Sequence, residues 1–249
     1  NNAFRLRGAQ PSPEVETYCE ANSLDCAFVP DDRRLSDFKL FVTDMDSTLI
    51  TIECIDEIAD MQGIKPQVAA ITARSMAGEL DFTASLRERV ALLEGLPLSA
   101  LEQVYRERLK LMPGARELVR ACRDAGIRTL LISGGFTFFT DRLRDELGLD
   151  HAVANELEVV NGHLTGRLLG DVIDAQAKAD WLVRLRDEMG LAPAQTIAMG
   201  DGANDLKMLA VAGLGVGMHP KPVVRQHADV SLRYVGLDGL PRLFAPAVS

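Results

Sequence analysis

Two aspartates, two residues apart, follow a short apolar run early in the chain. The segment FVTDMDSTLI at 41–50 places Asp44 and Asp46 directly after residues that predict a buried strand. Two bare carboxylates so close together repel each other, and a divalent cation is the simplest way to offset that repulsion. Such a pair also occurs by chance on protein surfaces, so the other motifs must decide between the two interpretations.

A second polar turn supplies another carboxylate. The segment GDGAND at 200–205 follows an apolar run and contains Asp201. By itself it indicates a turn with a helix cap. Taken with the first pair it predicts a Mg²⁺ site, because Mg²⁺ takes oxygen ligands and commonly uses only one or two carboxylates.

A carboxylate beside such an ion can be a nucleophile. Attack by Asp44 on a phosphate ester would form an aspartyl-phosphate, and Mg²⁺ with a lysine would reduce the charge repulsion that opposes it. Asp46 can donate a proton to the leaving oxygen and later activate water as a base. The second carboxylate therefore favours turnover over storage of the phosphoryl group.

Phosphate also needs hydrogen-bond donors. The segment SGG at 133–135 ends an apolar run, so Ser133 and the amides of Gly134 and Gly135 can cradle phosphate oxygens. The alternative is a plain tight turn.

A lysine on an apolar helix face offers a further donor. Lys178 stands at helical spacing from Trp181, Leu182 and Leu185. Such a lysine either extends its stem along the apolar surface or reaches a site, and we favour the site.

One helix predicted between the first two motifs carries an arginine on its apolar face. That face is formed by Phe82, Leu86, Val90 and Leu93. Arg89 is seven residues after Phe82 and shares its stripe, whereas Arg87 points away. An inward arginine needs an anion, which is either a structural glutamate or a substrate carboxylate.

An acidic residue lies where this helical region begins. Glu53 comes nine residues after Asp44, and its ordinary interpretation is an acid at a helix N-terminus. Together, Glu53 and Arg89 can bind an ammonium and a carboxylate. A phosphorylated amino acid carries both groups.

The elements that position these residues form an α/β pattern. Apolar runs predict strands at 40–43, 128–133, 196–200 and 214–218, and helical patterns follow at 114–126, 138–148, 177–190 and 204–213. Continuous apolar strands alternating with helices predict a Rossmann-like parallel sheet with helices on both faces. Ligands bind such sheets at the carboxyl ends of strands, where all three polar motifs fall.

Three regions are predicted along the chain. Residues 1–37 form an N-terminal extension without an assigned role, 38–52 and 112–249 form the core, and 53–111 form a helical cap over the site. Asp81 and Ser99 are predicted to cap two of its helices. A small β-hairpin is predicted at 155–170, because Asn161-Gly162 separates two alternating runs.

The composition of the chain limits which binding partners and which cellular compartment we expect. The 249 residues carry a formal net charge of −9 without a basic run, which predicts no nucleic-acid or membrane partner. Cys19, Cys26, Cys54 and Cys122 form no CxxC pattern, and the chain shows no signal sequence, so we expect reduced thiols and a cytoplasmic location. The oligomeric state is left open, with a homodimer among the options.

These motifs also carry a family resemblance. DMDSTL, SGGF, AQAKAD and GDGANDLKM resemble the ordered motifs of the haloacid-dehalogenase superfamily of phosphohydrolases. Three longer segments, DMDSTLITIECIDEIA, MAGELDFTASLRERVALLEGLP and ISGGFTFFTDRLRDELGLD, resemble its phosphoserine phosphatases, and the match runs from about 38 to 236. The implied reaction releases L-serine from O-phosphoserine, the last step of phosphorylated serine biosynthesis.

The resemblance implies a role for each matching residue. Asp44 would be the nucleophile and Asp46 the acid and base. Mg²⁺ would be held by the side chains of Asp44 and Asp201 and the backbone carbonyl of Asp46, with Asp205 supporting it. The residues implied to bind phosphate are Ser133, Gly134, Lys178 and Asn204. The residues implied to bind the serine moiety are Glu53 and Arg89, with Met76 and Phe82 as pocket walls.

Two other functions remain open at this point. A related enzyme could pass the phosphoryl group to another alcohol, such as homoserine, because the same aspartyl-phosphate serves both reactions. A non-catalytic receiver domain would also carry a phosphorylated aspartate. Asp46 and the complete cap argue against a receiver, which needs neither.

Overall fold

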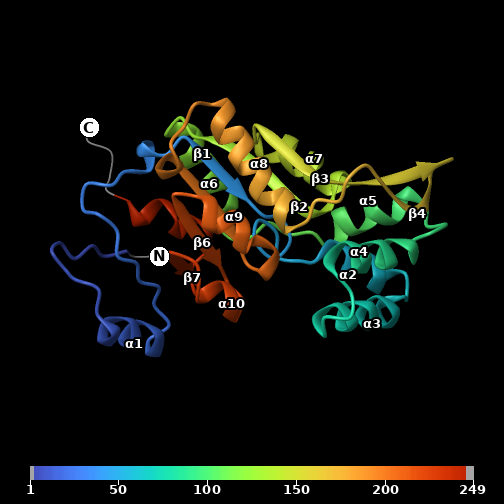
Figure 1. The fold of residues 1–249 in the computed structure, drawn as a ribbon, viewed down its shortest axis with the longest axis horizontal. Coiled ribbons are helices and arrows are strands. Elements are labelled where there is room, and N and C mark those ends of the chain that lie inside the picture. Colours follow the sequence, from blue (N-terminus) through green and yellow to red (C-terminus); the bar gives the residue numbers. More distant parts are fainter. Residues whose placement is uncertain (1–2, 245–249) are drawn as a thin grey trace.

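A mostly parallel sheet forms the centre of the molecule (Figure 1). The computed structural model describes residues 3–244, so the outermost residues of the predicted extension and core, 1–2 and 245–249, lie outside the described residues. Within that range the strand order is β4-β3-β2-β1-β5-β6-β7, and only the β3–β4 pair is antiparallel. The strands are β1 (Leu40–Thr43), β2 (Arg128–Phe136), β3 (His151–Val160), β4 (His163–Leu169), β5 (Thr196–Gly200), β6 (Leu214–Met218) and β7 (Val230–Leu232).

Helices cover both faces of this sheet because adjacent strand residues point to opposite sides. Phe41 and Leu131 pack with α6 and α7, whereas Val42 and Leu130 pack with α8 and α9. The helices are α6 (Ala115–Asp124), α7 (Thr137–Leu147), α8 (Ala175–Glu188), α9 (Leu206–Val211) and the short α10 (Pro222–Arg225). The predicted α/β fold with helices on both faces is confirmed.

Four helices lie between β1 and β2, at the right of Figure 1. They are α2 (Cys54–Met61), α3 (Lys65–Met76), α4 (Phe82–Ala91) and α5 (Leu98–Glu107), and we call them the helical insertion. The two connections to the core run side by side, since Thr51 N donates to Lys110 O at 2.9 Å and Met112 N donates to Leu49 O at 2.9 Å. The division into extension, core and cap stays a prediction.

The two predicted helix caps of the insertion differ in outcome. The Asp81 carboxylate accepts from Ala84 N at 2.7 Å and caps α4 as expected. The prediction for Ser99 is wrong, because α5 already begins at Leu98 and Ser99 lies inside the helix. Pro97 stands at the N-cap position, and no side chain caps the helix. The entry to α5 is fixed instead by backbone pairing with the β3–β4 hairpin, where Leu98 N donates to Gly162 O at 2.9 Å.

That hairpin turns as the sequence predicted. Asn161 has φ 50° and Gly162 φ 77°, so both turn residues are left-handed, as a type I′ turn requires. Gly95 N donates to Leu164 O and Leu164 N to Leu96 O, both at 2.8 Å. The hairpin therefore ties the helical insertion to the core at a point distant from the two connections.

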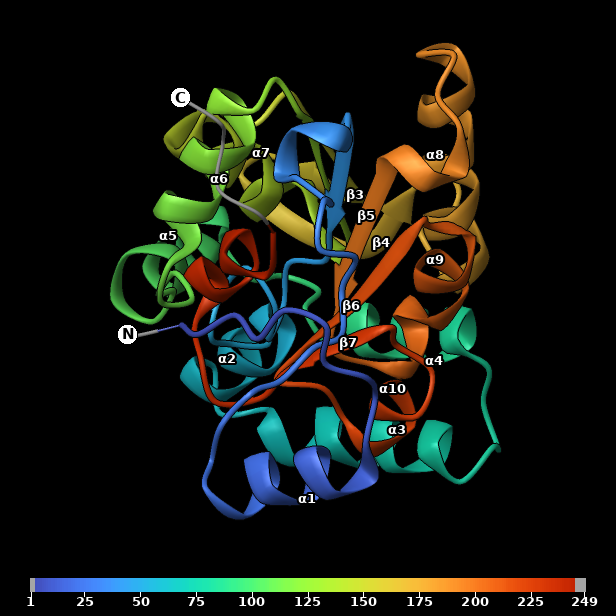
Figure 2. The same cartoon turned by 90° about the vertical axis from the view of Figure 1, so that its left-hand side faces the viewer.

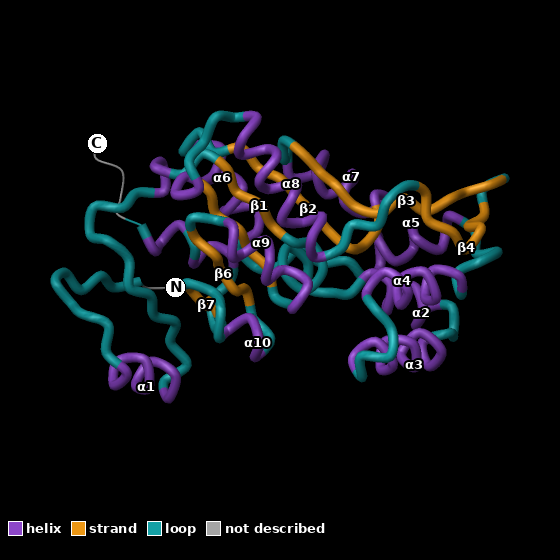
Figure 3. Tube along the Cα trace, viewed as in Figure 1, coloured by secondary structure: helices purple, strands orange, loops and turns teal. Residues whose placement is uncertain are grey.

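The N-terminal extension packs beside β7, the edge strand of the sheet (Figure 2). It holds α1 (Pro13–Ala21), and most of its remainder is loop (Figure 3). The Asp25 carboxylate accepts from the backbone amides of Arg233, Tyr234 and Val235 at 2.8–3.0 Å. Glu20 forms ion pairs with Arg225 and Arg233. No helix within residues 3–244 is long and apolar enough to cross a bilayer.

Candidate active site

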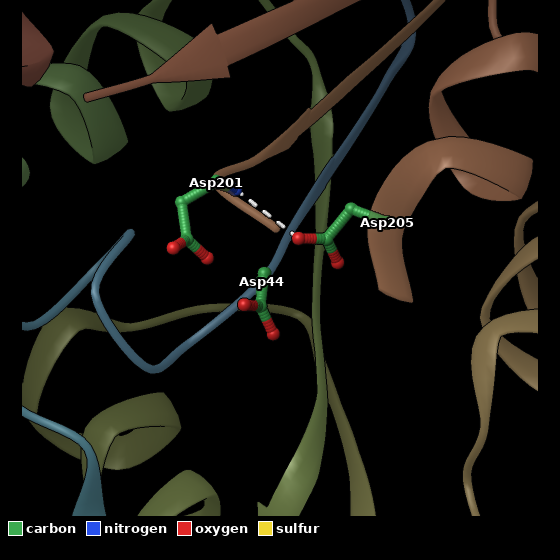
Figure 4. A group of neighbouring side chains, drawn as sticks. All are labelled: Asp44, Asp201 and Asp205. Carbon is green, nitrogen blue, oxygen red and sulfur yellow. Dashed lines mark hydrogen bonds between the residues drawn. The ribbon is translucent and has the colours of Figure 1, made fainter. Parts of the chain in front are cut away.

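Three aspartates from two neighbouring strand ends form one buried cluster (Figure 4). Asp44 follows β1 and Asp201 follows β5, and these strands pair in parallel with Thr43 opposite Met199. Asp205 joins them from the 3₁₀ turn Ala203–Asp205. One carboxylate oxygen of each lies within 4.8 Å of the others, and each residue is at most 5% exposed. The predicted convergence of the DMD and GDGAND motifs is therefore seen.

A buried lysine supplies the positive charge at this cluster. Lys178 is 1% exposed, and its Nζ lies 2.6 Å from Asp44 Oδ1 and 2.7 Å from Asp205 Oδ1. It stands in the first turn of α8, where the Asp174 carboxylate caps the helix by accepting from the amides of Gln176 and Ala177. Lys178 therefore reaches the cluster and does not extend along the apolar surface to solvent.

Burial and mutual repulsion shape the charges here. Burial raises the pKa of Asp44 well above its usual range, and the negative charge of Asp205 adds to it, against the opposing effect of Lys178. Burial alone would lower the pKa of Lys178, but Asp205 and Asp44 outweigh it and the pKa is raised. Three buried carboxylates facing one buried lysine are a donor set that a divalent cation fits, since the cation would offset the remaining repulsion.

Asp205 uses both of its oxygens within the protein. Oδ1 accepts from Lys178, and Oδ2 accepts from the backbone amides of Asp201 and Gly202, each at 3.1 Å. The carboxylate therefore fixes the turn that carries Asp201. This arrangement suits the supporting part implied for Asp205 better than direct metal ligation.

A second lysine near the cluster was missed. Lys221 Nζ lies 3.0 Å from Asp201 Oδ2, and its backbone amide donates to Asp201 O at 2.9 Å. It follows β6, another strand that ends at this edge of the sheet. The rule that strand ends converge would have singled it out, because it stands three residues after a strand that the sequence predicted.

Asp46 is less buried than Asp44 and lies beside the SGG segment. Its Oδ1 accepts from Cys54 N at 3.2 Å. A Cβ on Gly135 would lie 3.1 Å from its Oδ2 and 2.9 Å from Met45 Cε, so Gly135 lies close against both side chains. Burial, and then the nearby charge of Glu53, raises the pKa of Asp46 to about 7. A carboxyl group with this pKa can both give and take a proton near neutral pH.

The SGG segment bulges out of β2. The pairing of β2 with β3 is irregular between Ile132 and Phe136. Ser133 is 1% exposed and its Oγ accepts from Gly135 N at 2.8 Å, which leaves the hydroxyl proton able to donate. The Gly135 amide donates to Ser133 in this structure, and its expected part in binding phosphate stays a prediction.

The helical insertion brings its own residues to the same place. A Cβ on Gly134 would lie 3.0 Å from the Phe82 ring, so α4 begins against the SGG segment. Arg89 is partly buried, and burial lowers its pKa while the charges of Asp56, Glu53 and Asp46 oppose that shift. Arg89 Nε donates to Ser85 O at 3.3 Å, and the nearby carboxylates give the arginine an acidic surrounding at the junction of core and insertion.

Glu53 is held by a residue that the sequence analysis did not single out. Its Oε1 accepts from Ser47 Oγ at 2.8 Å, and Ser47 has φ 56°. Burial raises the pKa of Glu53, against this hydrogen bond and the charge of Lys221. The sequence alone does not show that Ser47 adopts this left-handed backbone conformation or that its hydroxyl reaches Glu53.

For two predicted site residues, Met76 and Asn204, the described part of the structure shows no contact with the other site residues that would define their part in binding. Met76 ends α3 and is 86% exposed, so in this structure it walls no enclosed pocket. Asn204 is partly buried in the turn after β5, with its Oδ1 2.6 Å from the position of a Cβ on Gly202. The implied roles of Met76 and Asn204 stay predictions.

Comparison with known proteins decides the family. The family model of haloacid dehalogenase-like hydrolases matches residues 41–210. The chain belongs to this family. A phosphoserine phosphatase from Polaromonas sp. is 55% identical and the match covers 85% of this chain and 92% of the relative. One from Vibrio cholerae is 46% identical, covering 98% of this chain and 74% of the relative.

Solved structures of this hydrolase family agree with the curated relatives. A probable phosphoserine phosphatase from Vibrio cholerae has a TM-score of 0.86 and 46% identity, over 95% of this chain and 73% of that one. A substrate-bound phosphoserine phosphatase and a phospho-aspartyl intermediate analogue each have a TM-score of 0.77 and 36% identity, over 84% of this chain and 99% of theirs. The recognised resemblance to phosphoserine phosphatases is confirmed.

Proposed function

We propose that this hydrolase is a Mg²⁺-dependent phosphatase that converts O-phospho-L-serine to L-serine and phosphate, as the last step of phosphorylated serine biosynthesis. The observation that carries the proposal is the buried Asp44 carboxylate, held by Lys178 beside Asp201 and Asp205. The relatives' names support the substrate, and the solved phospho-aspartyl analogue of a relative supports a covalent intermediate.

The metal would be held by the side chains of Asp44 and Asp201 and the carbonyl of Asp46, with Asp205 fixing the turn. These are the hard oxygen donors that Mg²⁺ prefers. When bound, Mg²⁺ would offset the negative charges of the phosphate and of the carboxylate that attacks it.

The reaction proceeds in two steps on the protein's own groups. Asp44 attacks phosphorus, the bond to the serine oxygen breaks, and Asp46 gives that oxygen a proton. Asp46 then takes a proton from water, whose oxygen attacks phosphorus and breaks the bond to Asp44. Phosphate leaves, and both aspartates return to their starting states.

The remaining site residues bind the substrate. Phosphate would be bound by Ser133, Gly134, Lys178 and Asn204. Glu53 would bind the ammonium and Arg89 the carboxylate of the serine moiety, with Met76 and Phe82 beside it. Arg89 lies on the insertion and Glu53 at its junction with the core, so substrate recognition is shared between the two.

We expect Arg89→Ala to raise KM for phosphoserine about 30-fold or more, because a partly buried cation that pairs with a substrate carboxylate contributes about 2 kcal/mol or more. Hydrolysis of p-nitrophenyl phosphate, which lacks that carboxylate, should stay near the wild-type rate. Arg87→Ala is the matched control, since Arg87 is exposed on the same helix. Equal losses on both substrates would show instead that Arg89 is structural.

The compartment and the partners are part of the proposal. The four cysteines are free thiols in the structure, which supports work in the reducing cytoplasm. We predict a small-molecule substrate and no nucleic-acid partner. The oligomeric state stays open, with a homodimer as one option.

A further inference from the structure

A buried asparagine links two segments of the proposed phosphate site. Asn155 lies in β3, opposite Phe136 of β2, and is 2% exposed. Its Nδ2 donates to Gly134 O at 2.8 Å, and its Oδ1 accepts from Ile173 N at 2.8 Å. The donor and the acceptor of one side-chain amide are therefore each hydrogen-bonded to the backbone of a different segment.

The two segments carry the proposed phosphate donors. Gly134 follows Ser133 at the bulge of β2. Ile173 precedes Asp174, which caps α8 and whose carbonyl accepts from Lys178 N at 3.0 Å. The carbonyl of Ile173 lies 3.6 Å from the position of a Cβ on Gly134, so the two segments are in contact where Asn155 joins them.

The amide is the group that this position needs. Asparagine presents one donor and one acceptor on the same planar group, whereas a carboxylate presents only acceptors. An ionised aspartate would keep the bond from Ile173 N but turn an oxygen toward the Gly134 carbonyl. That buried carbonyl would lose its donor and face a like charge, which is costly, so the two segments would shift relative to each other.

We infer that Asn155 is a positioning residue for phosphate, which sets the spacing between the Ser133–Gly134 donors and Lys178. It touches neither the reacting atoms nor the cluster of aspartates. The inference rests on the proposed function, because the phosphate site is part of that proposal.

The test compares Asn155→Asp and Asn155→Ser with a control variant at the other end of the β2–β3 pair. Thr129 of β2 is 3% exposed, and its Oγ1 donates to Asp150 Oδ2 and accepts from Asp150 N, both at 2.9 Å, just before β3 begins. Thr129→Val removes these buried bonds at the opposite end of the strands. Inorganic phosphate with Mg²⁺ is the probe, and its Kd is measured by calorimetry beside the Tm.

Both Asn155 variants are expected to raise the Kd of inorganic phosphate about tenfold or more. They should lower kcat/KM equally on phosphoserine and p-nitrophenyl phosphate, while inhibition by L-serine stays within about twofold. Thr129→Val should lower the Tm by a similar amount and leave the phosphate Kd within about twofold.

A phosphate Kd within about twofold of wild type in both Asn155 variants would overturn the inference, as would an equal rise in Thr129→Val. Asn155→Ser is the smaller variant and serves if the buried charge of Asn155→Asp prevents folding. Calorimetry decides the role of Asn155 even if the wild type releases no phosphate from phosphoserine, so a failure of the proposed function is distinguishable from a failure of this inference.

Discussion

Asp44→Asn is expected to lower kcat for phosphoserine by at least about 10⁴-fold, because an amide oxygen cannot form the aspartyl-phosphate. The fold should survive. Burial and the charge of Asp205 already disfavour the ionised carboxylate, so its removal relieves repulsion in the metal-free protein. Phosphate release measures the loss, and the Tm without Mg²⁺ should equal or exceed that of the wild type.

Residual activity above about 1% of the wild type, in protein free of wild-type contamination, would contradict a covalent mechanism on Asp44. A strong fall in Tm would contradict the electrostatic account of the cluster. Acid trapping of a phosphorylated wild-type chain, absent from the variant, provides an independent check.

Lys178→Met should be the most destabilising change in the site. It removes the buried cation that lies 2.6 Å from Asp44 and 2.7 Å from Asp205, which leaves two buried carboxylates unpaired. Breaking a buried ion pair in this way costs about 3–5 kcal/mol. Loss of a positioned donor to the phosphate should also lower kcat by about 10²-fold or more. Urea unfolding measures the first effect and phosphate release the second.

Lys207→Met is the control for this prediction. Lys207 is exposed, and its Nζ donates to Gln176 Oε1 at 3.1 Å, so it contacts the same helix without entering the site. Its free energy of unfolding should change by no more than about 0.5 kcal/mol. Mg²⁺ should restore more stability to Lys178→Met than it adds to the wild type. Equal stability of the two lysine variants would mean that the buried pair is not as the structure places it.

The elements and site residues that could be predicted from the sequence are those that short local patterns of residues determine. Buried parallel strands are continuous apolar runs, so Asp44, Ser133 and Asp201 could be placed at strand ends and brought together. A type I′ turn needs positive φ at both central residues, which Asn161-Gly162 adopts readily, so the hairpin turn could be placed. Lys178 could be predicted as a site residue because a charge on an apolar helix face is unusual.

The parts that sequence missed depend on contacts between distant segments. Asn155 joins backbone groups 21 and 18 residues away, and an isolated asparagine in a strand gives no sign of them. Ser99 was misjudged because pairing of the preceding residues with the hairpin, not a local cap, starts α5. The strand β7 is only three residues long, too short for an apolar pattern to show.

The central claim is a Mg²⁺-dependent phosphatase selective for phosphoserine. It is tested most directly by phosphate release from O-phospho-L-serine with Mg²⁺ and with EDTA, beside phosphothreonine and p-nitrophenyl phosphate. We expect release that EDTA abolishes and that strongly favours phosphoserine. Mg²⁺-dependent release from the aryl phosphate alone would contradict the assigned substrate and the pairing of Glu53 with Arg89. Undiminished release in EDTA would contradict the metal site at Asp44 and Asp201.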